Sequence, residues 1–145
     1  FDRKLLAWHA ESEASQRLTA IPGLGIVTAT AMAATVTDPS QFRSGRQFAA
    51  WLGLTPQQHS TGGKTQLGGI SKQGDRYLRR LLVVGATAVI RHTKDKPTPM
   101  ANWIRKLLEK KPFRLVSVAL ANKLARIVWV VLTRKEAYRP YQLAA

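Results

Sequence analysis

The chain has 145 residues, a length that suits one domain with at most a small appendage. It contains no cysteine, which excludes disulfide frameworks and thiolate metal sites. Lys and Arg number 23 against 8 Asp and Glu, giving a formal net charge of +15, and a field of that sign attracts polyanions, of which nucleic acid is the commonest.

The first half of the chain is predicted to be helical. A weakly amphipathic helix is expected over residues 1–19 and is ended by "AIPGLG" at 20–25. A second helix with small side chains follows over 26–36 and stops at Asp38-Pro39-Ser40. A short third helix ends at Gly53, and its buried side is predicted to consist of Phe48, Ala49, Trp51 and Leu52.

The second half begins with a glycine-rich loop over about 54–72, whose periodicity favours neither a hairpin nor irregular structure. A strong helix starts at Asp75, with Arg76, Arg80 and Arg91 pointing away from its apolar stripe. Further helices are predicted over 101–111 and 114–134, separated by Pro112. The expected fold is mostly α, a compact multi-helix domain. The predicted stripe consists of Leu78, Leu81, Leu82, Gly85, Ala88 and Val89.

A long apolar run at 115–132 raises the alternative of a membrane protein. Asn122, Lys123 and Arg126 interrupt this run, and charges at its centre favour a buried helix over a membrane span. The first residues are polar and charged, so no signal peptide is predicted. We therefore expect no membrane partner, and a basic membrane-surface protein is the least favoured explanation of the charge.

The segment "IPGLGIVTATAM" after the first helix has the form of a helix-hairpin-helix element. Gly23 and Gly25 would leave backbone N–H groups uncovered beside a helix N-terminus, where they could hold a phosphate without reading bases. Arg43 and Arg46 could add contacts to the same backbone. The alternative is a Gly-Pro turn between two core helices.

The loop "HSTGGKTQLGGISKQG" at 59–74 places hydroxyl groups among glycines directly before a basic helix. It lacks the spacing of a P-loop, and no G-x-S-x-G elbow supports a hydrolase triad. The eight carboxylates are scattered along the chain, so neither a complete two-metal nuclease site nor any other metal site is expected within it. A serine nucleophile acting on a phosphodiester remains as the enzymatic alternative.

Such a nucleophile needs an accessible hydroxyl group and several cations around the pentacoordinate transition state. The candidates are Ser60, Ser71 and Thr61, of which Thr61 is disfavoured because its methyl group crowds the attack. Each could instead be a turn or cap residue in a loop that only holds phosphate. The candidate phosphate-binding cations are Lys64, Lys72, Arg76, Arg79 and Arg80.

The run "GGISKQGDRYLRRLL", within residues 21–90, resembles the C-terminal domain of the DEDD-type, RNA-guided bacterial insertion-sequence transposases. The later "VALANKLARIVWVVL" is similar to the closing helix of that domain, so the resemblance extends from Ile21 to Leu132. By motif position, it makes Ser60 in "HSTGG" the match to the family's nucleophile. In the family, the nucleophilic serine attacks DNA and forms a covalent protein–DNA intermediate during strand exchange, and the resemblance implies this role for Ser60.

The resemblance also implies what this chain would need in order to react. These transposases carry an N-terminal RuvC-like domain that holds Mg²⁺, joined by a spacer helix to the serine-bearing domain. The RuvC-like domain is missing from this sequence, so the chain alone is expected to hold no cofactor and to be inactive. The partners implied are DNA, a structured guide (bridge) RNA, the missing domain and further copies in a homo-oligomer.

These inferences give a domain organisation and a function. Residues 1–20 are expected to end the spacer helix, 21–54 to form the helix-hairpin-helix segment, 55–134 to carry the serine loop with its helices, and 135–145 to be a tail. The expected function is to bind nucleic-acid backbone and supply the serine in the bacterial cytoplasm, at the nucleoid. The rival hypothesis is a non-catalytic nucleic-acid-binding module.

Overall fold

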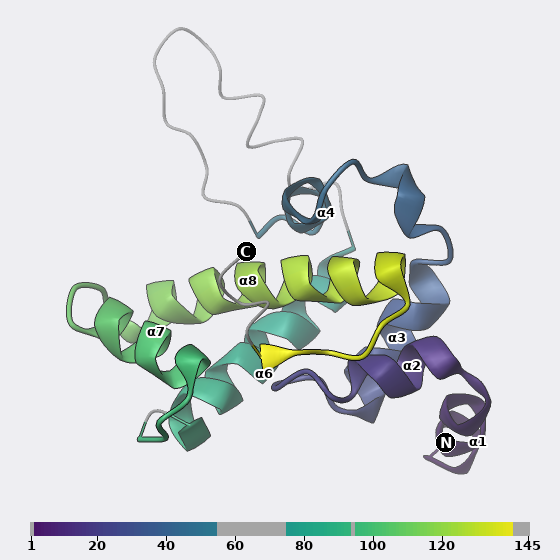
Figure 1. Cartoon of the computed structure of the whole chain (residues 1–145), viewed down its shortest axis with the longest axis horizontal. Helices are drawn as coiled ribbons and strands as arrows, with labels where there is room; N and C mark the ends of the chain where they lie inside the picture. Colours follow the sequence, from purple (N-terminus) through teal and green to yellow (C-terminus); the bar gives the residue numbers. More distant parts are fainter. Residues whose placement is uncertain (1, 55–74, 94, 141–145) are drawn as a thin grey trace, which may run out of the picture.

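The computed structural model of the chain describes residues 2–54, 75–93 and 95–140. These ranges contain seven α-helices, one 3-10 turn and no strand, which confirms the mostly helical, compact fold (Figure 1). The serine loop lies outside the described residues. The elements are α1 (Asp2–Glu11), α2 (Glu13–Leu18), α3 (Ile26–Thr35), η1 (Pro39–Gln41), α4 (Gly45–Trp51), α6 (Arg76–Thr93), α7 (Pro99–Leu108) and α8 (Phe113–Arg134).

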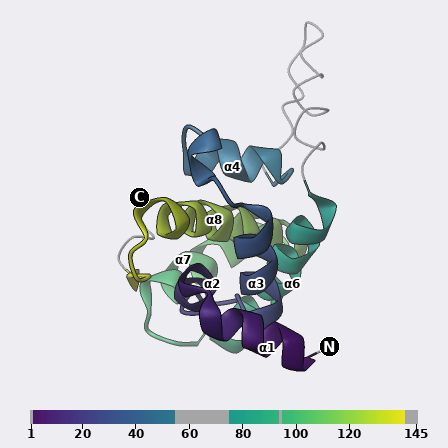
Figure 2. The ribbon, with the colours of Figure 1, turned by 90° about the vertical axis from the view of Figure 1, so that its right-hand side faces the viewer.

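Helix α8 is the centre of the molecule. It runs between α4 on one side and α6 on the other, and α7 and α2 also pack against it (Figures 1 and 2). Its length and hydropathy would allow it to cross a membrane, but more than half of its apolar stretch is buried inside the protein, as in a core helix. Its fully buried side chains include Val116, Leu120, Leu124 and Val128. Each contributes about 2 kcal/mol of hydrophobic stabilisation.

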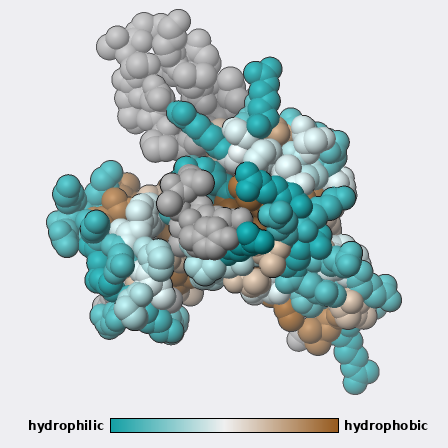
Figure 3. Space-filling view, in the orientation of Figure 1, coloured by the Kyte–Doolittle hydropathy of each residue, from teal (hydrophilic) through white to brown (hydrophobic). Residues whose placement is uncertain are grey.

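The N-terminal segment is two helices, where the sequence predicted one. Ser12 leaves the helical conformation and accepts a hydrogen bond from the backbone N–H of Ser15, which caps α2. The buried Ser15 hydroxyl group also lies 2.7 Å from Nδ1 of His9. A serine can cap a helix as readily as it can continue one, so periodicity did not reveal the break. Leu6 and Trp8 on α1 remain 51% and 42% exposed. Figure 3 shows the surface of the molecule coloured by hydropathy, with a hydrophobic region near the N-terminal helices.

The turn between α2 and α3 is pressed against the middle of α6. Gly23 has φ of 90°, a left-handed conformation that side chains rarely adopt. A Cβ atom at Gly85 of α6 would lie 2.2 Å from the carbonyl oxygen of Gly23. Both glycines are therefore required for the close approach of the turn to α6.

Helix α4 begins after a Ser44 cap and ends at Trp51, and Gly53, with φ of 80°, terminates it as predicted. Phe48, Ala49 and Leu52 are buried as expected, whereas Trp51 is half-buried in an aromatic cluster with Phe42 and Phe48. The turn before α4, η1, is fixed to α8 because Trp129 donates a 3.0 Å hydrogen bond to the carbonyl oxygen of Pro39.

Helix α6 buries Leu78, Leu82 and Val89 as predicted, and Leu81 is half-buried. The prediction for Ala88 is wrong, because it is exposed while Ala86 is buried in its place. The buried positions 78, 82, 86 and 90 are four residues apart, the spacing of a ridge that packs into the groove of a neighbouring helix.

Candidate nucleic-acid interface

Three arginines occupy the first two turns of α6. The Asp75 carboxylate fixes the start of the helix by accepting hydrogen bonds from the backbone N–H groups of Tyr77 (2.9 Å) and Leu78 (3.1 Å). Arg76 and Arg80 are then exposed, and Arg79 between them is half-buried. Cations are disfavoured at a helix N-terminus, and like charges three or four residues apart repel each other. This cluster therefore costs stability unless an anion lies against it.

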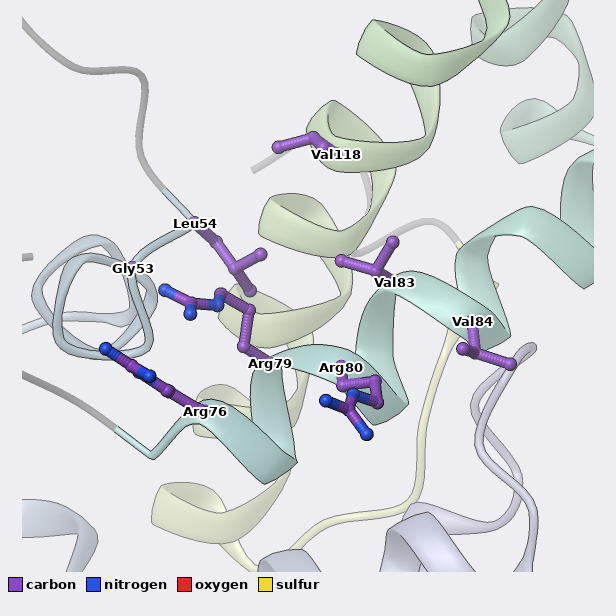
Figure 4. Close-up of a pocket in the computed structure, with 8 residues that line it drawn as sticks. All are labelled: Gly53, Leu54, Arg76, Arg79, Arg80, Val83, Val84 and Val118. Atoms are coloured by element: carbon purple, nitrogen blue, oxygen red, sulfur yellow. The ribbon is translucent and has the colours of Figure 1, made fainter. Parts of the chain in front are cut away.

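The three arginines line a cleft of about 600 Å³, which we call the arginine cleft. Figure 4 shows Arg76 and Arg79 directed toward Gly53 and Leu54 at the end of α4. No acidic residue is among the described residues that line it, so its field favours an anion. Its lining consists of Gly53, Leu54, Arg76, Arg79, Arg80, Val83, Val84 and Val118.

The cleft also lies at both ends of the segment 55–74. On one side, the N–H groups of Gly53 and Leu54 bond the carbonyl oxygens of Ala50 (2.9 Å) and Ala49 (3.0 Å), which closes α4. Leu54 is buried, and its carbonyl oxygen accepts a 3.3 Å hydrogen bond from Asn122 of α8. On the other side, Asp75 starts α6. Leu54 and Asp75, the described residues on either side of the segment 55–74, therefore both lie beside the three arginines.

Sequence reasoning missed the role of Asn122. In the sequence, Asn122 is recognisable only as a polar residue inside an apolar run. That position is evidence against a membrane span. Its partner, the carbonyl oxygen of Leu54, is 68 residues away in the sequence and could not be identified by spacing. Three predicted site residues, Ser60, Lys64 and Lys72, lie outside the described residues, as do the alternative nucleophiles Ser71 and Thr61.

The two glycines of the predicted phosphate-binding hairpin have different surroundings. Gly23 is half-buried, and a Cβ atom there would lie 3.0 Å from Cγ2 of Val89. Gly25 is exposed as the N-cap of α3, with open space where its Cβ atom would be. Gly25 thus has room for a phosphate group, while the conformation and packing of the turn already require glycine at position 23.

Arg43 and Arg46 are both exposed and flank the N-terminus of α4. Gly53 and Leu54, at the other end of α4, belong to the arginine cleft. A seven-residue helix is about 10 Å long, so these two arginines are separated from the cleft by that helix. The structure brings together Arg76, Arg79 and Arg80 and leaves the other described candidates apart from them.

A further cation, Lys123 of α8, packs with its ammonium group 4.9 Å from the centre of the Trp103 ring. Burial, together with the neighbouring charge of Arg126, lowers the pKa of Lys123 below its usual 10.5. In the described part of the chain, no three His, Asp or Glu side chains gather into a group that could hold a metal ion. The expected Mg²⁺ site was assigned to a domain outside this sequence and stays a prediction.

Comparison with known proteins gives a consistent assignment. Residues 15–100 match the sequence profile of the "Transposase IS116/IS110/IS902 family". The chain is 55% identical over 125 residues to a "Probable family 20 transposase" of Pseudomonas aeruginosa, which covers 86% of the chain and 37% of that protein. It is 45% identical over 139 residues to the "Transposase for insertion sequence element IS1111A" of Coxiella burnetii, covering 96% of the chain and 38% of that protein.

A third relative is a "Putative transposase y4pF/y4sB" of Sinorhizobium fredii, 48% identical over 139 residues, covering 95% of the chain and 36% of the relative. In all three comparisons nearly the whole chain is aligned. The chain nevertheless spans little more than a third of the length of these relatives.

Proposed function

Because the chain belongs to the transposase IS116/IS110/IS902 family, we propose that it is the domain of a DNA transposase that binds nucleic-acid backbone and supplies a serine nucleophile. The observation that carries this proposal is the arginine cleft, which three arginines line beside the two ends of the segment with the candidate serines. Guanidinium groups bind phosphate oxygens in a bidentate manner, so the cleft fits a phosphodiester.

Ser60 is the proposed nucleophile. It lies six residues after Leu54, so its Cα atom is within about 20 Å of that fixed point even in a fully extended chain. In the proposed step, the Ser60 oxygen attacks phosphorus and loses its proton to a base, and a serine–phosphate bond forms. The bond from phosphorus to one bridging oxygen breaks, that oxygen takes up a proton, and the nucleotide leaves with a free hydroxyl group. The arginines would stabilise the charge of the pentacoordinate transition state.

The remaining expectations extend this proposal to a longer protein. A RuvC-like domain would hold Mg²⁺, a guide RNA would select the DNA, and several copies would assemble at the nucleoid in the cytoplasm. The lengths of the relatives support the existence of further domains. Specificity would then come from base pairing, because a cleft of guanidinium groups reads phosphates and carries no sequence information.

Binding by the cleft is tested by comparing two double variants. One removes two positive charges from the cleft, and the other removes two from a distant surface turn. The double variant Arg79→Gln/Arg80→Gln should weaken binding of a short DNA and reduce the slope of log K against log salt by about one per lost phosphate contact. The matched control, Lys110→Gln/Lys111→Gln, removes the same charge from the exposed α7–α8 turn. Equal effects of the two variants would mean that net charge alone drives binding.

The rival hypothesis, a binding module without catalysis, predicts the same binding results. Ser60→Ala separates the two hypotheses. In the proposed full-length transposase it should leave DNA binding nearly intact and abolish strand transfer. Unchanged strand transfer would favour the binding module, provided that Ser71→Ala and Thr61→Ala also leave it unchanged.

A further inference from the structure

An aromatic ring and an apolar side chain lie on either side of Arg80 on the exposed surface of α6. Tyr77 is 53% exposed, Arg80 is exposed and Val84 is 61% exposed. Their spacings of three and four residues place them one above another on one face of the helix, with neighbouring Cβ atoms about 5–6 Å apart. We call these three residues the Tyr77 stripe.

The Tyr77 stripe continues into the arginine cleft, because Arg80 and Val84 also line that cleft (Figure 4). Val118 of α8, 38% exposed, adds apolar surface from the other side. A phosphate group on its own gains nothing from contact with valine or a tyrosine ring. Exposed apolar surface directly beside guanidinium groups instead fits a ligand that is anionic at one end and apolar at the other.

An unpaired nucleotide has this combination of groups. Its phosphate is anionic, and the face of its base is apolar and stacks on aromatic rings. In a duplex, the base faces are covered by the neighbouring base pairs and cannot reach a side chain. The cleft volume of about 600 Å³ lies within the usual range for small-ligand sites.

We propose that the Tyr77 stripe and the adjoining arginine cleft bind an unpaired nucleotide of a DNA or RNA strand, with the base on Tyr77 and Val84 and the phosphate on Arg80. This inference rests on the proposed nucleic-acid binding and specifies the form of nucleic acid that is bound. The acidic group nearest in the sequence, Asp75, has Oδ1 engaged by two backbone N–H groups at the helix start.

The test measures binding of the 145-residue chain to labelled oligonucleotides of equal length by fluorescence anisotropy. The strands are oligo(dT), oligo(U), an abasic strand with the same phosphates, and a duplex. Tyr77→Ala removes the ring and Tyr77→Phe retains it. Both changes are at an exposed position, and unfolding temperatures will verify that the variants fold. Val84→Asn, also at an exposed position, tests the apolar contact independently.

We expect the abasic strand to bind the unchanged protein at least about fivefold more weakly than oligo(dT), because stacking contributes about 1–3 kcal/mol per base. Tyr77→Ala should weaken oligo(dT) binding by a similar factor without affecting the abasic strand or the duplex, and Tyr77→Phe should change little. Oligo(dT) and oligo(U) differ in the sugar and in the 5-methyl group of the base, so similar affinities would mean that the site accepts both kinds of strand.

The inference is overturned if the abasic strand binds as tightly as oligo(dT), or if Tyr77→Ala weakens all strands equally. In either case, the proposed function stands when Arg79→Gln/Arg80→Gln still weakens binding more than Lys110→Gln/Lys111→Gln. Failure of that second comparison, or the absence of binding to any strand, would remove the proposed function and this inference with it.

Discussion

Two sequence signals for phosphate binding lie against helix α6, and their surroundings differ in the structure: the hairpin that contains Gly23 packs on its middle, and the arginines lie at its beginning. At the middle, Gly85 is covered by the turn that contains Gly23, with no room for a Cβ atom between them. At the beginning, Arg76, Arg79 and Arg80 line an open cleft with no acidic side chain among the described residues around it. Packing therefore already explains one glycine, whereas packing offers no explanation for the arginines.

The difference shows how a structural role can be separated from a binding role. A residue required by packing has neighbours at contact distance, as Gly85 has. Cations that cost stability at a helix N-terminus and line a cleft with no acidic residue among its described lining residues suggest a ligand, as at the start of α6. The following predictions test this contrast, from the largest expected effect to the smallest.

Gly85→Val should be the most destabilising change. Its Cβ atom would start 2.2 Å from the carbonyl oxygen of Gly23, so the turn would have to move away from α6. We expect a loss of about 3 kcal/mol or more in the free energy of unfolding, measured by urea denaturation. A loss below about 1 kcal/mol would mean that the turn is not packed as described.

Gly25→Ala provides the matched control at the other glycine. Nothing lies within 4 Å of its added Cβ atom, so the free energy of unfolding should fall by less than about 1 kcal/mol. If the hairpin also holds phosphate, this Cβ atom will hinder access to the N-terminus of α3 and weaken duplex binding in the folded protein. Unchanged duplex binding would leave the hairpin with a packing role only.

Asn122→Leu should cost about 1–2 kcal/mol, because the buried end of α4 loses the hydrogen bond to the carbonyl oxygen of Leu54. If this contact also positions the serine segment, strand transfer by the full-length transposase should fall while DNA affinity stays the same. Asn102→Leu on the exposed face of α7 is the control. Equal destabilisation by both changes would contradict the anchoring role.

Arg76→Gln should increase stability and decrease affinity. Removing a cation from the first turn of α6 relieves its repulsion with the helix dipole, by about 0.3 kcal/mol or more. DNA binding should weaken because a phosphate contact is lost. Lys106→Gln, in the last turn of α7, should instead decrease stability slightly, because a cation is favourable there. Lower stability of Arg76→Gln would show that the arginine is part of the packing.

The smallest effect concerns pH. Because burial lowers the pKa of Lys123 in the folded state, the unfolded chain holds this proton to higher pH than the folded chain does. Stability should therefore rise as pH approaches the usual value of 10.5. Burial raises the pKa of Tyr138, which has the opposite effect above 10.0. Comparing the unchanged chain with Lys123→Met cancels the tyrosine contribution, and the unchanged chain should gain stability relative to the variant as the pH rises toward 10.5.

Local signals in the sequence predicted much of the fold. Asp75 and Gly53 mark the start of α6 and the end of α4 because caps depend on residues close in sequence. The break at Ser12 was missed because serine is compatible with both a helix and a cap. Ala88 was assigned to the core in place of Ala86. Both are alanines, and which of them is buried depends on which side of α6 a neighbouring helix packs against.

The candidate site could be predicted only in part. Arg76, Arg79 and Arg80 were identified from charge and from their position after a glycine-rich loop. The opposite wall of the cleft comes from Leu54 and Val118, which no spacing rule connects to these arginines. Tyr77 and Val84 were not identified, because their exposure depends on which side of α6 faces α8 and α3.

The central claim is that a serine of the segment 55–74 attacks a phosphodiester. The most direct measurement uses the proposed full-length transposase with guide RNA, Mg²⁺, and donor and target DNA. The reaction is stopped with denaturant and digested, and mass spectrometry searches for a nucleotide bound to a serine peptide. We predict an adduct on Ser60. An adduct on Ser71 or Thr61 would retain the mechanism and correct the residue. Strand exchange without an adduct on any of the three would contradict serine catalysis.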